Sequence, residues 1–256
     1  MEGTPQSQQI MNIEGKVALI TGGAHRVGKA ITMELAQRGA DVIVNYNQSK
    51  DRAQTTVDEA ETLGVRAIAQ KADVANQTEV SRMISQSEKL LGPIQILINS
   101  ASLFAKTKLP TNSKEDWDEV TNTLIQGSFN CCNRIAPIMQ TAGSGVIINI
   151  VDLMAWLPRR GYAAHSVGKA ALMALTRQLA VDFAPNIRVN AVAPGPVLSP
   201  DDYSQKTRDR IASGTLLKRW GKPDDVSRAV IFLVESDYIT AEYITVDGGE
   251  RYGGNQ

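Results

Sequence analysis

Short apolar runs rich in β-branched residues alternate along the chain with longer stretches in which apolar residues recur at helical spacing. The apolar runs are continuous rather than interrupted at every second position, which is typical of strands buried on both faces. We expect strands at 17–20, 42–44, 67–69, 96–99, 146–150, 187–192 and 244–246. We expect helices at 27–38, 50–63, 77–91, 115–140, 162–183 and 222–235.

This alternation predicts the fold class. Strands interleaved with helices imply right-handed crossovers and a parallel sheet. We therefore expect one α/β domain over residues 14–256, with a doubly wound parallel sheet of about seven strands and helices on both faces. Residues 1–13 are polar and are predicted to form a disordered extension, in which Met11 is an alternative start. Segment 195–214 has no clear period and is predicted to be a loop that covers a substrate.

The charge balance, the lengths of the apolar runs and the cysteines indicate which partners and which location to expect. Lys plus Arg and Asp plus Glu both number 27, so the chain has no net charge to attract nucleic acid or an anionic membrane. No apolar run reaches the roughly 20 residues of a membrane span, and the first residues lack the segments of a secretory signal. The two cysteines, Cys131 and Cys132, are adjacent and ill placed to bond to each other, which favours free thiols and a cytoplasmic location.

A glycine-rich segment, Thr21-Gly22-Gly23-Ala24-His25-Arg26-Val27-Gly28, joins the first predicted strand to the first predicted helix. Gly22 permits a tight turn, and Gly28 permits close packing of the helix on the strand. The start of the helix then faces the pyrophosphate of a dinucleotide. The position of this segment at the start of a strand–helix series predicts a Rossmann-type fold.

The segment after the second strand indicates which dinucleotide binds. Enzymes that use NAD usually place an acidic residue there, where it binds the ribose 2′-hydroxyl. This chain has Asn45, Tyr46, Asn47 and Ser49 instead, with no acid to repel a 2′-phosphate. Together with Arg26 in the preceding loop, these residues predict NADP(H) as the cofactor.

Five further segments match known family motifs: Ala72-Asp73-Val74, Asn99-Ser100-Ala101, Lys169, Asn190-Ala191-Val192-Ala193-Pro194-Gly195 and Val246-Asp247-Gly248-Gly249. With them, the chain resembles the short-chain dehydrogenase/reductase family over essentially its whole length after residue 13. The resemblance implies cofactor contacts from His25, Val27, Asp73, Val74, Asn99, Ser100, Ala101, Lys169, Pro194, Gly195 and Val197.

Within that family the chain looks most like the pteridine reductases. Arg26 stands where most members have glycine, Ser102-Leu103-Phe104 stands in place of a simpler Ala-Gly context, and Asp152 stands where most have a catalytic serine. The resemblance implies a planar substrate that stacks on Phe104 and hydrogen-bonds to Ser102, with Asp152 as a proton donor or orienting group. Taken alone, Phe104 also fits a core aromatic.

Two family positions are changed. His165 stands four residues before Lys169, where the family has tyrosine, and Leu124 replaces an asparagine that anchors a water in the proton relay. The spacing places His165 and Lys169 on one helical face, where the lysine cation favours a neutral imidazole able to donate an N–H. Imidazole is shorter than phenol by roughly 2 Å. Either His165 acts as an acid, or it fills space while Asp152, with a pKa raised by burial, is the main donor. Tyr162 is expected over the site.

The leading expectation is an NADPH-dependent reductase of a pteridine-like substrate. The resemblance also implies a homotetramer, built through the helices near 115–140 and 162–183 and through Tyr252. Two alternatives stay open. One is a catalytically impaired sensor or partner subunit that binds NADPH and a pterin, and the other is a reductase of different specificity that uses an Asp-His-Lys site. No metal site is expected.

Overall fold

A seven-stranded parallel sheet forms the centre of the computed structural model, which describes residues 11–111, 113–200 and 203–253. The strand order is β3-β2-β1-β4-β5-β6-β7, so β2 and β3 lie on one side of β1 and β4 to β7 lie on the other. This confirms the predicted fold class. The strands are β1 (Val17–Thr21), β2 (Asp41–Tyr46), β3 (Ala67–Lys71), β4 (Ile94–Asn99), β5 (Gly145–Ile150), β6 (Ile187–Pro194) and β7 (Tyr243–Val246).

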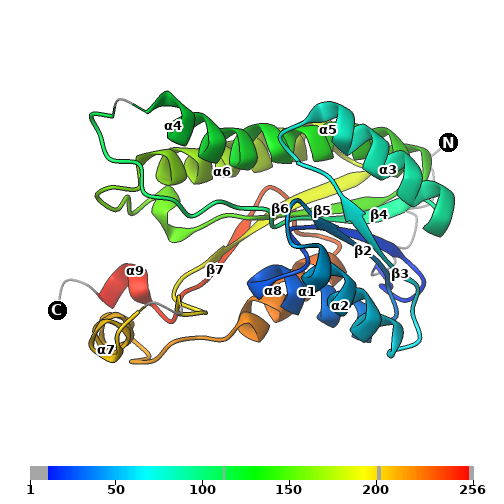
Figure 1. Ribbon diagram of the computed structural model, residues 1–256. Coiled ribbons are helices and arrows are strands. Elements are labelled where there is room, and N and C mark those ends of the chain that lie inside the picture. Colours follow the sequence, from blue (N-terminus) through cyan, green and yellow to red (C-terminus); the bar gives the residue numbers. More distant parts are fainter. Residues whose placement is uncertain (1–10, 112, 201–202, 254–256) are drawn as a thin grey trace, which may run out of the picture.

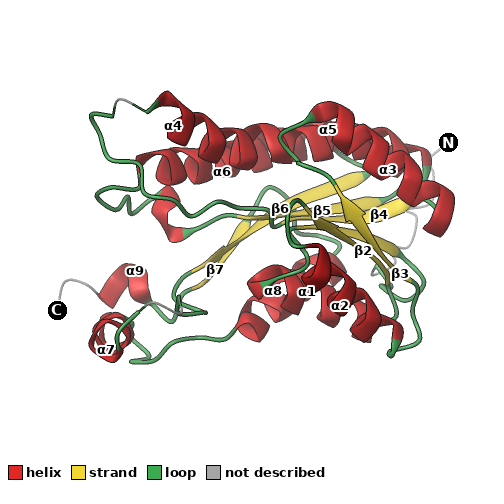
Figure 2. Ribbon diagram, viewed as in Figure 1, coloured by secondary structure: helices red, strands yellow, loops and turns green. Residues whose placement is uncertain are grey.

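Helices cover both faces of the sheet (Figures 1 and 2). One layer contains α1 (Arg26–Gln37), α2 (Lys50–Glu61) and α8 (Pro223–Glu235), and the other contains α3 (Gln77–Leu91), α4 (Lys114–Thr121), α5 (Gly127–Thr141) and α6 (Ala163–Phe183). Alternate residues of one strand face opposite layers. Ala18 and Ile20 join the core on the α1 side, whereas Val17 and Leu19 join the core on the α5 side. The continuous apolar runs of the strands follow from this double burial.

Two segments differ from the sequence prediction, and two short helical turns are added to it. Segment 195–214 contains a helix, α7 (Gln205–Gly214), which buries no residue and therefore shows no apolar period. The helix predicted at 115–140 is α4 and α5 joined by a π-helical turn, η1 (Asn122–Gln126). Short helical turns at η2 (Leu153–Ala155) and α9 (Glu250–Gly253) complete the elements.

The last residues of the predicted N-terminal extension, 1–13, belong to the folded domain. Ile13 is only 2% exposed and belongs to the core on the α1 side, and Met11 packs against the same cluster. The domain therefore begins before residue 14. Residues 1–10 lie outside the described part of the chain.

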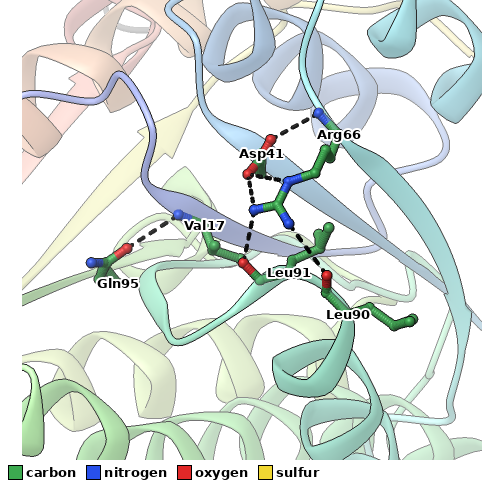
Figure 3. Close-up of polar contacts among 6 residues, drawn as sticks. All are labelled: Val17, Asp41, Arg66, Leu90, Leu91 and Gln95. Carbon is green, nitrogen blue, oxygen red and sulfur yellow. Dashed lines mark hydrogen bonds and ion pairs between the residues drawn. The ribbon is translucent and has the colours of Figure 1, made fainter.

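A polar clasp joins strands and helix at the edge of the sheet opposite the ends of β1 and β4 (Figure 3). Arg66 donates to the Asp41 carboxylate through Nε at 2.9 Å and to the Leu91 carbonyl at the end of α3 through Nη2 at 2.9 Å. Gln95 accepts the backbone N–H of Val17 at 3.2 Å. A cation at a helix C-terminus meets carbonyls that have no helical partner. The clasp fixes the start of β2 and β3 relative to α3.

The two cysteines lie inside the protein. Cys131 and Cys132 are free thiols on α5, both fully buried in the core between α5 and the sheet. Burial raises the pKa of Cys132 to about 12, and it raises the pKa of Cys131 further. The free state predicted for both thiols is confirmed.

Candidate active site

Most of the predicted cofactor and substrate residues line one cavity of about 620 Å³ at the carboxyl ends of the strands. The reversal of strand order between β1 and β4 opens a crevice at this edge in doubly wound sheets. The predicted residues that line the cavity are Gly22, His25, Arg26, Val27, Gly28, Ser100, Ala101, Ser102, Phe104, Asp152, His165, Lys169, Pro194, Gly195 and Val197.

Other predicted residues do not border this cavity: Asn45, Tyr46, Asn47, Ser49, Asp73, Val74, Asn99 and Tyr162. Conversely, several lining residues were not predicted as site residues: Ile150, Val151, Leu153, Met154, Arg159, Pro196, Leu198, Pro200, Tyr203, Ile211, Trp220 and Glu250. Five of these fall in the segment predicted to cover a substrate.

Two glycines shape the phosphate loop as the sequence predicts. Gly22 has φ of +61°, and a Cβ there would lie 3.0 Å from the Ala101 Cα. A Cβ on Gly28 would lie only 2.2 Å from the carbonyl oxygen of Gly22. The first turn of α1 has no acidic residue, so its positive dipole end faces the cavity without a carboxylate of its own.

Asn45 supports this loop from behind. Its Oδ1 accepts the N–H of Gly22 at 3.3 Å, and its Nδ2 donates to the Ala72 carbonyl at 3.1 Å. The side chain is buried, so the predicted direct contact between Asn45 and a cofactor is not supported. Asn47 and Ser49 follow the end of β2 and are exposed.

Buried hydrogen bonds tie the loops after β1 and β4 together. Thr21 Oγ1 accepts the N–H groups of Ser100 and Ala101, both at 3.0 Å. Asn99 is buried and donates to Asn149 Oδ1 at 2.8 Å, so its side chain supports the strand ends from within the sheet. These bonds fix the floor of the cavity.

Asp73 and Val74 also have structural contacts. Asp73 Oδ1 accepts the N–H of Ala75 at 2.9 Å, in the turn before α3. Val74 packs on Gly127 at the start of α5, where a Cβ would approach its Cγ2 to 2.6 Å. Their contacts fix the turn between β3 and α3.

Arg26 has a backbone conformation that favours glycine, with φ of +52°. A left-handed conformation costs a residue with a Cβ about 1–2 kcal/mol. The side chain is exposed, and its Nη2 donates to the Leu198 carbonyl at 3.0 Å. Arg26 therefore connects the phosphate loop to the segment after β6, and its strained backbone points to a role for the side chain.

Asp152 follows β5 and caps the short η2 turn, where its Oδ1 accepts the N–H of Met154 at 2.7 Å. Burial alone would raise its pKa. His165, the Met154 N–H and Lys169 together outweigh burial and hold the pKa of this carboxyl below its usual value. The expectation that burial makes Asp152 a protonated donor is therefore wrong, because these groups favour the carboxylate.

His165 is only 2% exposed and lies beside Asp152. Its Nδ1 lies 3.0 Å from the Leu103 carbonyl, which can only accept, so Nδ1 carries the hydrogen. Nε2 has no hydrogen-bond partner among the described residues and lies 3.7 Å from Asp152 Oδ2. A neutral ring would present only a lone pair to the carboxylate, so His165 favours the Asp152 carboxylate as the protonated ring, which carries an N–H at Nε2. The expected donation of an N–H into the cavity by a neutral ring is wrong, since that N–H is held by Leu103.

Lys169 lies one turn further along α6 and is almost fully buried. Its Nζ donates to the Ile150 carbonyl at 2.7 Å. Burial lowers the pKa of Lys169 to about 8, although Asp152 opposes this shift. Leu124 packs against α6 at Gly168, where a Cβ would lie 2.7 Å from Leu124 Cδ1. The leucine is fully buried against the helix that carries Lys169.

Phe104 is half exposed at the mouth of the cavity. Its ring stacks on Tyr162 at a centroid distance of 4.7 Å and meets His165 edge-on at 5.0 Å. Phe104 is therefore not a core aromatic. Tyr162 supports it from outside the cavity, and Ser102 is an exposed neighbour on the same loop.

Arg159 and Glu250 form an ion pair at the cavity, with Nη2 2.6 Å from Oε1. The signal for Glu250 was available in the sequence, because it follows the last strand at the same edge where Ser100 follows β4. Arg159 lies between η2 and α6 and has no such signal.

The described residues contain no cluster of three or more His, Cys, Asp or Glu side chains arranged to hold a metal ion. In the same part of the chain, no helix combines the length and apolar character needed to cross a membrane.

Known proteins resemble this chain over most of its length. Residues 22–250 match the family described as enoyl-(acyl carrier protein) reductase. The 3-oxoacyl-[acyl-carrier-protein] reductase of Staphylococcus epidermidis is 35% identical over 91% of this chain and 98% of its own. The 2-dehydro-3-deoxy-D-gluconate 5-dehydrogenase of Formosa agariphila is 32% identical over 95% of both chains. A 7α-hydroxysteroid dehydrogenase, solved with NADH and 7-oxo glycochenodeoxycholic acid, superposes with a TM-score of 0.89 at 28% identity over 96% of this chain and 98% of its own.

Proposed function

Because the chain belongs to the short-chain dehydrogenase/reductase family, we propose that it is an NADPH-dependent reductase of a pteridine or a similar planar heterocycle. The family makes it an oxidoreductase that uses a nicotinamide cofactor, and the curated relatives above act, by their names, on a 3-oxoacyl group and a sugar acid. The proposed substrate and cofactor are inferred from the residues that line the cavity. The observation that carries it is the half-exposed ring of Phe104 at the cavity mouth.

NADPH is proposed from the charges around the phosphate loop. Arg26 lines the cavity, and the exposed residues Asn47 and Ser49 after β2 bring no carboxylate to oppose a 2′-phosphate. The steroid dehydrogenase neighbour was solved with NADH, so the choice between the two cofactors needs a direct titration. Lys169, which the fold places beside Asp152 and the end of β5, would hold the nicotinamide ribose.

A flat substrate fits the aromatic side of the cavity. Phe104 offers one face of its ring to Tyr162 and the other to a second planar group. When bound, the nicotinamide would supply hydride to a C=N bond of the substrate. The nitrogen of that bond then needs one proton, which this chain must deliver.

We assign that proton to Asp152 and His165 acting together. The Nε2 lone pair of His165 and the Asp152 carboxylate lie 3.7 Å apart, and one proton between them turns a repulsive contact into an ion pair. Leu103 fixes the ring through Nδ1. Asp152 lines the cavity and orients the shared proton toward the substrate nitrogen. Losing that proton to the reduced nitrogen returns the pair to its neutral-imidazole form, and solvent restores it after release.

The test is NADPH oxidation with a dihydropterin by the parent, Asp152→Asn, His165→Gln and the double variant. Removing a general acid typically costs 10²–10⁴-fold. We expect similar losses from both single variants and little further loss in the double variant, because the two residues act as one unit. The exposed Asp58→Asn on α2 is the control for loss of charge. Additive losses, or a His165→Gln variant as active as the parent, contradict the shared proton.

The replaced family positions, His165 and Leu124, favour a second candidate, a protein that binds NADPH and a pterin without turnover. Tight binding of both molecules, with no NADPH oxidation in the presence of a dihydropterin or a 3-oxoacyl thioester, would establish it. Turnover of the thioester alone would instead establish a reductase of different specificity that uses the same Asp-His-Lys site.

We also propose a cytoplasmic homotetramer. Free thiols at Cys131 and Cys132 suit a reducing compartment. Exposed apolar side chains on the outer helices offer one subunit interface, and the C-terminal Tyr252, which is 64% exposed, offers another. The large exposed apolar residues on α5 and α6 are Phe129, Val167 and Val181.

A further inference from the structure

Besides the Asp152–His165 pair, the cavity is lined by a second pair of charged residues, Arg159 and Glu250. Glu250 begins α9, and Arg159 lies in the loop between η2 and α6. Arg159 Nη2 donates to Glu250 Oε1 at 2.6 Å. The arginine side chain is 49% exposed and the glutamate only 19%, so the carboxylate is the inner partner.

The missing side chain of Gly195 makes room for this carboxylate. A Cβ on Gly195 would lie 3.2 Å from Glu250 Oε2 and 2.7 Å from the Asp247 Cβ. Gly195 directly follows β6, and its N–H donates to the Val246 carbonyl at 3.0 Å. Glu250 Oε2 therefore lies against the backbone at the end of β6, on the same edge of the sheet as Asp152.

Glu250 lies near a second carboxylate, Asp247, at this end of the cavity. Asp247 already accepts the N–H groups of Gly249 and Arg251, whereas Glu250 Oε2 makes no hydrogen bond with any residue that the structure describes. Burial raises the pKa of Glu250, Arg159 opposes that shift, and Asp152 and Asp247 add to it as neighbouring negative charges. A substrate anion would meet the same carboxylates, but an N–H donor would relieve them.

We propose that Glu250 is a specificity residue that binds the N–H donors of an amidine-like N–C–N edge, as in the 2-amino-4-oxo ring of a pterin. Arg159 is its counter-cation and binds Oε1, which leaves Oε2 available to a substrate. This inference rests on the proposed function, since it names the part of the heterocycle that the cavity recognises. Two parallel N–H···O bonds to a carboxylate give both strength and orientation.

The experiment compares two substrates that differ at one position. A dihydropterin carries the 2-amino group, and a dihydrolumazine carries a carbonyl oxygen there, which the Glu250 carboxylate would repel. The parent should have the lower KM for the dihydropterin. Glu250→Gln should raise that KM about 10- to 100-fold, as expected for loss of a hydrogen bond to a charged group, and should abolish the discrimination. Its Kd for NADPH should not change.

Two further variants complete the design. Glu250→Asp keeps the charge and should retain discrimination at a higher KM. Glu242→Gln removes an exposed glutamate outside the cavity and should behave as the parent.

The outcomes separate this inference from the proposed function. If the parent reduces the dihydropterin and Glu250→Gln leaves both KM values unchanged, Glu250 does not select the substrate, while the proposed function stands. If Glu250→Gln instead improves the KM for a carboxylate-bearing 3-oxo compound, Arg159 is an anion receptor and the inference is overturned. If the parent neither binds nor reduces the dihydropterin, the proposed function fails and this inference falls with it.

Discussion

The buried ammonium group of Lys169 should make folding more favourable as pH rises. Its pKa falls from an ordinary 10.5 to about 8, with burial as the main cause. Between these two values the unfolded chain holds the proton and the folded chain does not, so the free energy of unfolding increases with pH across this window. At 1.36 kcal/mol per pKa unit, the full effect is about 3 kcal/mol.

The measurement is urea unfolding of the parent and of Lys169→Met at pH 7, 8, 9 and 10. Methionine fills similar volume without a charge. The difference in unfolding free energy between the two proteins cancels the other titrating groups. We expect the variant to be more stable at pH 7 by up to about 3 kcal/mol, with the difference shrinking toward pH 10. A difference that is flat, or that grows with pH, refutes the reasoning.

The affinity for NADPH should fall as pH rises, whereas the free energy of unfolding increases. If Lys169 holds the nicotinamide ribose, its neutral amine above pH 8 donates a weaker hydrogen bond than the ammonium. Affinity for NADPH should then fall over the same range in which stability rises. An NADPH affinity that is independent of pH would separate Lys169 from the cofactor.

Two other predictions concern the phosphate loop and assembly. Arg26→Gly should raise Tm by about 2–4 °C because glycine accepts φ of +52° without strain, and should weaken NADPH about 10- to 100-fold while leaving NADH nearly unchanged. Thermal unfolding and fluorescence titration measure the two effects, and an equal loss for both cofactors would contradict the role of Arg26. Light scattering of the parent should give four subunits, and Val167→Glu should give smaller species, since Val167 is 47% exposed on α6. A monomeric parent at micromolar concentration contradicts the tetramer.

The fold could be predicted because both faces of the sheet are buried. Run 17–20 is apolar at every position and run 146–150 at every position except the buried Asn149, which leaves few alternatives to parallel strands. Helix α7 escaped prediction because it buries nothing and so leaves no apolar period. Ile13 was missed because one buried apolar residue in a polar segment makes no pattern.

Part of the site was predictable from residues that directly follow strands. The phosphate-loop residues follow β1, and Glu250 follows β7 in the same way. Asp152 follows β5 but was singled out by the family resemblance. Asn47, Ser49 and Asp73 also follow strands but do not border the cavity. Arg159 and Trp220 reach the cavity from loops whose paths depend on tertiary packing. The sequence also could not reveal that Leu103 holds the Nδ1 hydrogen of His165, or that the neighbours of Asp152 outweigh burial. Both depend on contacts between distant segments.

The two adjacent free thiols on α5 can report how often the protein opens. Thiolates are the reactive form, and Cys131 and Cys132 are fully buried with a raised pKa, so a thiol-labelling reagent can reach them only when the core on the α5 side separates. The labelling rate, compared with that of a free cysteine, therefore measures the population of the open chain. A dinucleotide that binds only the closed form should slow labelling in proportion to its occupancy. Affinity can thus be measured for any dinucleotide, and for any pterin added with it, without a single turnover.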